Sequence, residues 1–244
     1  MKIIAIANQK GGTAKTTTVA ALAVLLGRRG TRVHAVDMDP QASLTRAFGI
    51  SDETDGLYNA LTNRAGLQVQ VVSDNLTLTP STIELGSAET ELLHEPGREF
   101  FLRTCLEKTT LPENTVVLLD CPPSLGILAV NCLACSGGLI AVIQPGGFEL
   151  HALVHLQITI DAIRQRVNPD LSTLGAIITN ANRRRTITGQ VAAEISRLYP
   201  LLGTVRSDSK LLYATTAGQI QRLTTSKALN DYAEVIAQLD TILP

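Results

Sequence analysis

The sequence predicts an α/β fold, a doubly wound and mostly parallel sheet with helices on both faces. Short runs of aliphatic and β-branched residues alternate along the chain with longer segments of helical periodicity. The runs are nearly continuous in apolar residues, which is typical of strands covered by helices on both faces. No linker-like, repeated or low-complexity stretch interrupts the alternation, so residues 1–244 are expected to form a single domain.

The expected strands are the short apolar runs, in order KIIAIA (2–7), TRVHAVD (31–37), NLTLTP (75–80), TVVLLD (115–120), GLIAVIQ (138–144), LGAIITN (174–180) and LLGTVR (201–206). Helical periodicity lies between them, for example over residues 16–29, 98–109, 124–135, 149–167, 186–199 and 226–242. Strands that alternate with helices in this way indicate crossover connections between parallel strands.

Composition excludes some function classes. Apolar residues make up 45% of the 244 residues, which is enough for a sizeable core, and the net charge is −1. Aromatic residues make up only 3%, with no Trp, so a base-stacking platform for RNA or single-stranded DNA is not expected. The chain shows no secretion signal and no apolar run near the roughly 20 residues of a membrane span. A cytoplasmic protein is expected.

Two pairs of side chains have spacings that metal sites also use. Cys132 and Cys135 form a C-x-x-C within the apolar stretch LAVNCLACSGGLIAV, where small buried side chains on a helix are expected. The alternative is a redox or metal role, including an iron–sulfur cluster shared across a dimer. His151 and His155 are four residues apart on an expected helix, and without a third ligand we expect a solvated surface.

The segment ANQKGGTAKTTT (7–18) lies between the first expected strand and the first expected helix. Gly11 and Gly12 would let backbone N–H groups approach phosphate oxygens, and the helix N-terminus adds positive potential. Lys15 would neutralise the charge of the β- and γ-phosphates, and Thr16 would offer its hydroxyl to Mg²⁺. The segment predicts a site for ATP and Mg²⁺.

This loop departs from the G-x-x-x-x-G-K-[ST] pattern, because Gln9 and Ala14 occupy its glycine positions. It resembles the K-G-G-x-G-K-T-[ST] loop of the deviant Walker family of ParA, Soj and MinD ATPases, and the resemblance extends over nearly the whole chain. In that family the lysine that matches Lys10 reaches the ATP of a partner subunit. The resemblance therefore implies an ATP-dependent homodimer, with Lys10 and Lys15 as catalytic cations. The implied phosphate-binding residues are Lys10, Gly11, Gly12, Thr13, Ala14, Lys15, Thr16 and Thr17.

Ala14 raises a question about the backbone. If the position needs a positive φ, alanine destabilises the loop conformation by about 1 kcal/mol relative to glycine. If it needs only a small side chain beside phosphate, alanine is tolerated. We expect the second situation, with slow ATP turnover in either case. A site that binds nucleotide but barely hydrolyses it is the alternative.

Two aspartates complete the expected site. Asp39 lies in VDMDPQAS (36–43), which resembles the family's V-D-x-D-P-Q motif, and matches the switch aspartate that orients the attacking water and supports the metal. Asp120 ends the apolar strand in TVVLLDCPPSLG (115–126) and resembles a Walker B aspartate, which holds a Mg²⁺-bound water. The predicted metal site is therefore Thr16, Asp39 and Asp120, with Asp39 also catalytic.

The later motifs match the family less closely. VIQPGGFELHAL has Gly146 where the family has glutamate, which leaves open any dimer or activator contact of that glutamate. In IITNANRRRT, Asn180 and Asn182 are candidates to bind the adenine, with an ordinary turn as the alternative. Ser207 and Asp208 are further candidates, although the family's proline is missing from this segment.

Charge is distributed unevenly along the chain. Residues 50–115 hold 11 acidic and 4 basic side chains, whereas residues 163–227 hold 10 basic and 3 acidic ones. ParA and Soj proteins bind DNA without sequence preference through such basic residues. The candidates here are Arg183, Arg184, Arg185, Arg197, Arg206, Lys210, Arg222 and Lys227. The C-terminal LNDYAEVIAQLDTILP has no Lys or Arg, so the membrane binding of the MinD branch is not expected.

The resemblance implies a cycle in which ATP and Mg²⁺ drive dimerisation and the dimer binds nucleoid DNA. A ParB-like or McdB-like adaptor on a cargo then stimulates hydrolysis, which partitions or positions a plasmid, chromosome region or protein organelle. Operator-specific autoregulation is not expected, because the phosphate loop begins at residue 8. Two alternatives remain open, a redox or metal-handling P-loop protein and an ATP-switched regulator with little hydrolysis.

Overall fold

A computed structural model describes residues 1–51, 56–146, 149–181 and 186–240, without the side chains of 149–152 and 186–191. Its strands are β1 (Lys2–Ala7), β2 (Val33–Asp37), β3 (Gln70–Ser73), β4 (Leu76–Thr79), β5 (Val116–Asp120), β6 (Gly138–Ile143), β7 (Ser172–Ala181) and β8 (Leu201–Arg206). They form an eight-stranded sheet in the order β3-β4-β2-β5-β1-β6-β7-β8. Only the β3–β4 pair is antiparallel, so the mostly parallel α/β sheet is confirmed.

The helices are α1 (Lys15–Arg28), α2 (Ser43–Ala47), α3 (Leu57–Asn63), α4 (Leu85–Glu91), α5 (Phe101–Glu107), α6 (Ile127–Cys135), α7 (Glu149–Arg166), α8 (Thr186–Leu198), α9 (Ser209–Thr216) and α10 (Lys227–Leu239). Three short 3₁₀ turns accompany them in the described residues, η1 (Leu92–His94), η2 (Arg98–Phe100) and η3 (Ile220–Arg222).

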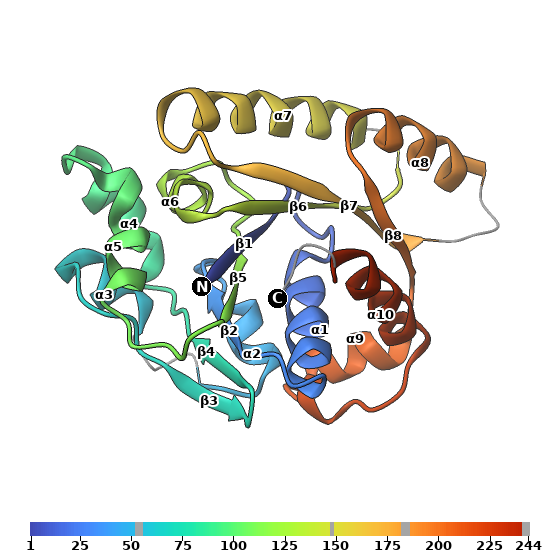
Figure 1. The fold of residues 1–244 in the computed structure, drawn as a ribbon, viewed down its shortest axis with the longest axis horizontal. Helices are drawn as coiled ribbons and strands as arrows, with labels where there is room; N and C mark the ends of the chain where they lie inside the picture. Colours follow the sequence, from blue (N-terminus) through green and yellow to red (C-terminus); the bar gives the residue numbers. More distant parts are fainter. Residues whose placement is uncertain (52–55, 147–148, 182–185, 241–244) are drawn as a thin grey trace.

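Two apolar cores lie on the two faces of the sheet. Alternate residues of β1 point to opposite faces, so Ala5 and Ala7 join one core whereas Ile4 and Ile6 join the other. The first core packs against α3–α8, and the second packs against α1, α2, α9 and α10 (Figure 1). This arrangement explains the nearly continuous apolar strands, because both faces are covered.

Every strand and helix range expected from the sequence has a counterpart, and the sequence missed several shorter elements. These are β3, α2, α3, α4 and α9. In β3 the burial alternates, and Val71 is 78% exposed on this edge strand, so no continuous apolar run marks it. The missed helices have between five and eight residues, too few for a clear 3.6-residue pattern.

Strand β1 lies in the middle of the sheet, between β5 and β6. The chain forms β2 on one side of β1 and returns to form β6–β8 on the other. In open parallel sheets, such a reversal leaves a crevice at the carboxyl ends of the strands. The loop that follows β1 lies at this crevice, where it leads into α1.

Candidate nucleotide-binding site

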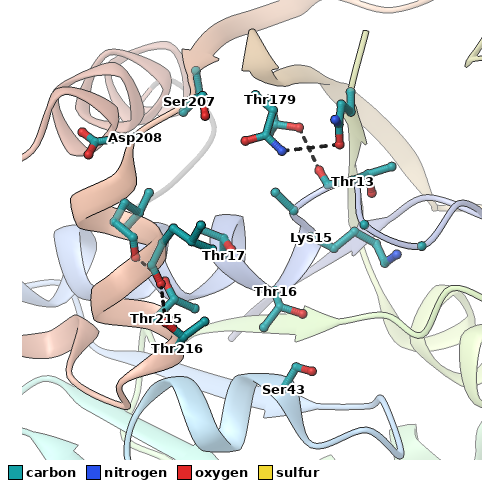
Figure 2. Close-up of a pocket in the computed structure, with 18 of the residues that line it drawn as sticks. Thr13, Lys15, Thr16, Thr17, Ser43, Thr179, Ser207, Asp208, Thr215 and Thr216 are labelled. Atoms are coloured by element: carbon teal, nitrogen blue, oxygen red, sulfur yellow. Dashed lines mark hydrogen bonds between the residues drawn. The ribbon is translucent and has the colours of Figure 1, made fainter. Parts of the chain in front are cut away.

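A cavity of about 970 Å³ opens at the carboxyl edge of the sheet. Its walls come from the phosphate loop and start of α1 (residues 11–17), Asp39, α2, the end of β7 and the β8–α9 segment. Figure 2 shows Thr16 and Ser43 near one end of this space and Ser207 and Asp208 at another. Segments from both halves of the chain therefore form one pocket.

The glycines of the phosphate loop face open space. A Cβ atom at Gly11 or Gly12 would meet no other atom within 4 Å, and both residues line the cavity. Gly12 has a φ of +74°, which favours glycine. Helix α1 begins at Lys15, directly after the loop, so its unpaired N–H groups and positive end lie at the cavity. This geometry fits a bound phosphate.

Ala14 adopts the left-handed conformation, with φ of 67° and ψ of 31°. The expectation that this position needs only a small side chain is therefore wrong. The backbone requires a positive φ here, as it would with the usual glycine, and alanine carries a strain of about 1 kcal/mol. Ala14 also lines the cavity, so the strained residue forms part of the phosphate loop wall.

The two lysines of the loop differ in position. Lys15 is buried at the cavity, and its Nζ donates to the carbonyl oxygen of Lys10 at 3.2 Å. Burial lowers the pKa of Lys15, while nearby Asp120 opposes that shift. The side chain of Lys10 is exposed on the loop that precedes α1. One cation therefore lies inside the site and the other lies on its outer surface.

Strands β6 and β7 each hold the loop by one hydrogen bond. The hydroxyl of Thr179 donates to the carbonyl oxygen of Thr13 at 2.8 Å, and Nδ2 of Asn8 donates to the carbonyl oxygen of Val142 at 2.6 Å. Sequence reasoning selected Asn180 and missed its neighbour Thr179. A threonine on a buried strand is too common to indicate such a contact.

The two aspartates of the VDMDPQ motif have different surroundings. Asp37 is fully buried and accepts hydrogen bonds from the backbone N–H and hydroxyl of Thr45 at 2.8 and 2.7 Å. Burial raises the pKa of Asp37 to about 6. Asp39 lines the cavity and accepts from the backbone N–H of Gln41 at 2.9 Å. Asp37 therefore holds the loop, and Asp39 faces the space for the nucleotide.

Asp120 lies at the end of β5, where it is buried behind the cavity wall rather than on it. Neither of its carboxylate oxygens has a hydrogen-bond partner among the described residues. Burial, together with the neighbouring charge of Asp37, raises the pKa of Asp120 well above its usual value, while the nearby Thr16 hydroxyl and Lys15 ammonium oppose the shift. An unpartnered buried carboxylate is unusual and indicates a position where a ligand belongs.

The oxygens near the loop fit Mg²⁺. Thr16, Asp39 and Asp120 offer a hydroxyl and carboxylates, which are the hard donors that this ion prefers. No set of three His, Cys, Asp or Glu side chains in the described part of the chain forms a metal cage. A Mg²⁺ ion needs no such cage, because it is usually held by one or two carboxylates together with substrate phosphates and water.

The adenine candidates lie on the cavity wall with one exception. Asn180, Ser207 and Asp208 line it, whereas Asn182 is outside the described residues. Asn180 lies near the end of β7 with a φ of 49°, and its Nδ2 donates to Oε1 of Gln144 at 3.4 Å. Asp208 caps α9 by accepting from the N–H of Lys210 at 2.8 Å. The cavity also includes Ser43, Arg46, Thr215 and Tyr232, which sequence reasoning missed.

The basic candidates divide into four groups. Arg183, Arg184 and Arg185 lie outside the described residues. Arg206 is held by the buried carboxylate of Asp231, with Nε to Oδ2 at 2.7 Å, and also lines the cavity, so it stays an untested DNA-binding candidate. Arg197 forms an exposed ion pair with Glu194 at 2.8 Å. The remaining three are exposed between α9 and the start of α10, namely Lys210, Arg222 and Lys227.

The cysteines are enclosed in the core. Cys132 and Cys135 are buried in α6, as expected, and burial raises the pKa of Cys135 to about 12 and that of Cys132 well above its usual value. Both thiols are therefore protonated and poor metal ligands. His155 is exposed on α7, and the side chain of His151 is outside the described residues.

Helices in the described part of the chain are all too short or too polar to cross a bilayer. The apolar side of α10, which includes Leu229, Val235 and Ile236, is buried in the core against α1 and β8. That side is used for packing within the molecule.

Comparison with known proteins identifies the family of this chain. A family model described as "AAA domain" matches residues 1–173. The chromosome partitioning protein ParA of Myxococcus xanthus is 38% identical over 199 residues, which cover 80% of this chain and 70% of that protein. The sporulation initiation inhibitor protein Soj of Bacillus subtilis is 35% identical over 205 residues, with 81% and 80% covered.

Solved structures share the fold. The cobyrinic acid a,c-diamide synthase of Mycobacterium smegmatis, determined with ADP and magnesium, is 33% identical with a TM-score of 0.82, and 98% of this chain and 94% of that chain are covered.

Two Mycobacterium tuberculosis relatives are 39% identical over 202 residues, and the match spans 63% of their length. The chain therefore belongs to the AAA-domain family and to the group of relatives named ParA and Soj.

Proposed function

We propose that this protein is a slow ATPase that dimerises with ATP and Mg²⁺, binds nucleoid DNA without sequence preference and positions a cargo. A ParB-like or McdB-like adaptor on the cargo would stimulate hydrolysis and release the dimer. The Mycobacterium smegmatis structure with ADP and magnesium supports the choice of nucleotide and metal. The Myxococcus xanthus and Bacillus subtilis relatives support the partition role, since one is named for chromosome partitioning.

The observation that carries the proposal is the different placement of the two lysines. Lys15 lies inside the cavity, where its ammonium group can neutralise the β- and γ-phosphates of the nucleotide in the same subunit. Lys10 is exposed on the outer side of the same loop. A cation in that position can reach the γ-phosphate in a second copy. Dimerisation would then distinguish ATP from ADP, because only ATP offers that charge.

The other residues complete the chemistry. During hydrolysis a water oxygen attacks the γ-phosphorus, and the bond to the β–γ bridging oxygen breaks to leave ADP and phosphate. Asp39 would orient that water from the cavity wall. Thr16, Asp39 and Asp120 would hold Mg²⁺ or its waters. When bound, Mg²⁺ neutralises charge on the phosphate oxygens.

Sedimentation of three variants tests the lysine roles. The wild type should dimerise with non-hydrolysable ATP but not with ADP or without nucleotide. Lys15→Ala should lose ATP binding altogether, whereas Lys10→Ala should bind ATP and remain monomeric. Lys108→Ala, an exposed lysine outside the cavity, is the matched control and should behave as wild type. A wild type with the same mass in all three nucleotide states would refute the proposed cycle.

Asp39→Ala separates binding from turnover. We expect this variant to form the ATP dimer and to release phosphate at least about 100-fold more slowly than wild type, because its water is no longer oriented. Phosphate release with DNA and candidate adaptors present measures the rate. Equal rates in the two proteins would remove Asp39 from the catalytic step.

Salt dependence tests the DNA contact. Binding through phosphate contacts releases counterions, so the affinity should fall steeply between 50 and 200 mM salt, by about 0.9 log units per contact for each tenfold rise. Lys210→Ala and Lys227→Ala should each reduce this slope by about one contact. Arg29→Ala removes a cation that is paired with Asp240 at 3.1 Å and is the matched control. Unchanged slopes in both lysine variants would show that neither lysine contacts DNA and that the DNA-binding surface lies elsewhere on the protein.

A regulator that binds ATP with little hydrolysis remains the second candidate, and the strained Ala14 is the observation that favours it. Phosphate release that stays undetectable with DNA and adaptor present would support that reading. The redox or metal-handling alternative has weaker support, because its cysteines are buried and protonated.

A further inference from the structure

A chain of hydroxyl groups reaches the strained residue of the phosphate loop. The carbonyl oxygen of Ala14 accepts two hydrogen bonds from Thr18, one from its backbone N–H at 2.9 Å and one from its hydroxyl at 2.8 Å. The Thr18 hydroxyl in turn lies 2.8 Å from the hydroxyl of Tyr232, which is 214 positions away on α10. Thr18 and Tyr232 are both buried.

The direction of this chain follows from the number of protons. A threonine hydroxyl has one proton, and Thr18 uses it on the Ala14 carbonyl. The bond between the two hydroxyls must then be donated by Tyr232. Burial also raises the pKa of Tyr232, so its phenol remains protonated and able to donate. The order is Tyr232 to Thr18 to Ala14.

The Ala14 carbonyl is the group whose orientation changes if the residue leaves the left-handed region. Two hydrogen bonds hold it at the start of α1, while alanine itself disfavours this conformation by about 1 kcal/mol. A buried hydrogen bond contributes a similar amount, about 1 kcal/mol. The two terms are of equal size, so the hydroxyl chain can offset the strain.

Helix α10 makes a second contact with the cavity wall through the residue before Tyr232. The buried carboxylate of Asp231 accepts hydrogen bonds from the backbone N–H and the guanidinium of Arg206, and both Arg206 and Tyr232 line the cavity. Two adjacent residues of α10 therefore contact two different segments that line the same space.

We propose that Tyr232 and Thr18 are positioning residues that hold Ala14 in its left-handed conformation and so replace the missing glycine of the phosphate loop. The inference rests on the proposed nucleotide site. Without the hydroxyl chain, the free protein would spend less time in the conformation that binds phosphate. The apparent dissociation constant rises by the inverse of that competent fraction.

The test is a double-mutant cycle in ATP affinity, measured by calorimetry with Mg²⁺ and a non-hydrolysable ATP. Tyr232→Phe should bind about fivefold more weakly than wild type, the equivalent of one lost hydrogen bond. Ala14→Gly removes the strain, so the same Tyr232→Phe change in that background should weaken binding by less than about twofold. Tyr213→Phe, a matched control on exposed Tyr213, should have no effect.

Variants of Thr18 keep the test decisive if Tyr232→Phe folds poorly. Thr18→Val removes the hydroxyl at constant shape, and with it both hydrogen bonds of the chain, so it should weaken binding by at least fivefold, whereas Thr18→Ser retains the hydroxyl and should keep the affinity of wild type. Unchanged affinity in Tyr232→Phe and Thr18→Val, or equal losses with alanine and glycine at position 14, would overturn the inference. A wild type that binds no nucleotide would instead refute the proposed function itself.

Discussion

The neighbouring strands β2 and β5 each end in a buried aspartate, and the two carboxylates differ in what surrounds them. Asp37 and Asp120 are partners in the strand register and are 0% and 1% exposed. Asp37 accepts from the N–H and hydroxyl of Thr45 and from the N–H of Asp39. Neither oxygen of Asp120 meets hydrogen-bond geometry with a described residue, although the Thr16 hydroxyl and the Lys15 ammonium lie near enough to lower its pKa.

We expect this difference between a carboxylate that holds the chain in place and one that is proposed to bind a ligand. A buried polar atom without a partner costs about 1–3 kcal/mol, and more for a charged group, so folded proteins rarely leave one. The partners of Asp37 come from its own loop, which fixes the path of the chain past Asp39. Asp120 lacks such partners because its partner is expected to arrive with the nucleotide and Mg²⁺.

Replacement of Asp120 should have the largest effect, and on activity alone. Asp120→Asn should slow Mg²⁺-dependent ATP hydrolysis by about 1000-fold, because it removes a charge that supports the metal. The free protein should lose little stability, since the variant exchanges one buried polar group without partners for another of the same shape and removes the buried charge. Phosphate release and thermal unfolding without nucleotide measure the two effects. A clear drop in the unfolding temperature of the free variant would contradict the comparison.

Replacement of Asp37 should have the opposite pattern. Asp37→Ala leaves the N–H groups of Thr45 and Asp39 without their acceptor and should lower the free energy of unfolding by about 3 kcal/mol. Thr45→Val removes one of the donated bonds and should cost about 1–2 kcal/mol. Urea denaturation measures both values. If Asp37→Ala unfolds with the midpoint of wild type, the carboxylate does not hold the loop.

The parts of the site that depend on local chemistry were predictable from the sequence. Gly11, Gly12 and Lys15 all lie in one short loop, and Asp120 ends an apolar run that is typical of a buried strand. The order of these segments along the chain then placed them at one edge of a parallel sheet. The strands that carry the site were found for the same reason.

Contacts between distant residues were not predictable. Thr179 reaches Thr13 over 166 positions, and Tyr232 reaches Thr18 over 214. Neither residue type has a distinctive pattern around it, because a threonine or tyrosine in an apolar segment is usually part of the core. The conformation of Ala14 belongs to the same class. The sequence around Ala14 is compatible with either backbone conformation. The left-handed conformation is observed together with the contact between Tyr232 of α10 and Thr18.

His34 extends the comparison to a second polar side chain of β2. Its ring is buried between two threonines of β4, with Nδ1 at 2.9 Å from the hydroxyl of Thr77 and Nε2 at 3.0 Å from that of Thr79. The Thr79 hydroxyl donates its proton to the carbonyl oxygen of Gln68 at 2.7 Å. Nε2 therefore carries the proton and donates to Thr79, so both nitrogens of the neutral ring are satisfied. Burial lowers the pKa of His34 to about 4.

The pH dependence of stability should reveal this neutral histidine, with a smaller effect than the changes above. Between the ordinary pKa of 6.5 and the folded value of about 4, only the unfolded chain binds the proton. Stability from His34 is therefore complete above pH 6.5 and is lost as the pH falls, by about 1 kcal/mol for each unit. Asp37 has the opposite sign in this range, so the measurement is the difference between wild type and His34→Gln in urea at each pH. A difference that stays constant from pH 7 to pH 4.5 would show that the folded protein binds a proton at His34 as readily as the unfolded chain does. The His34 ring on β2 would then be no better satisfied by hydrogen bonds than the carboxylate of Asp120 on β5.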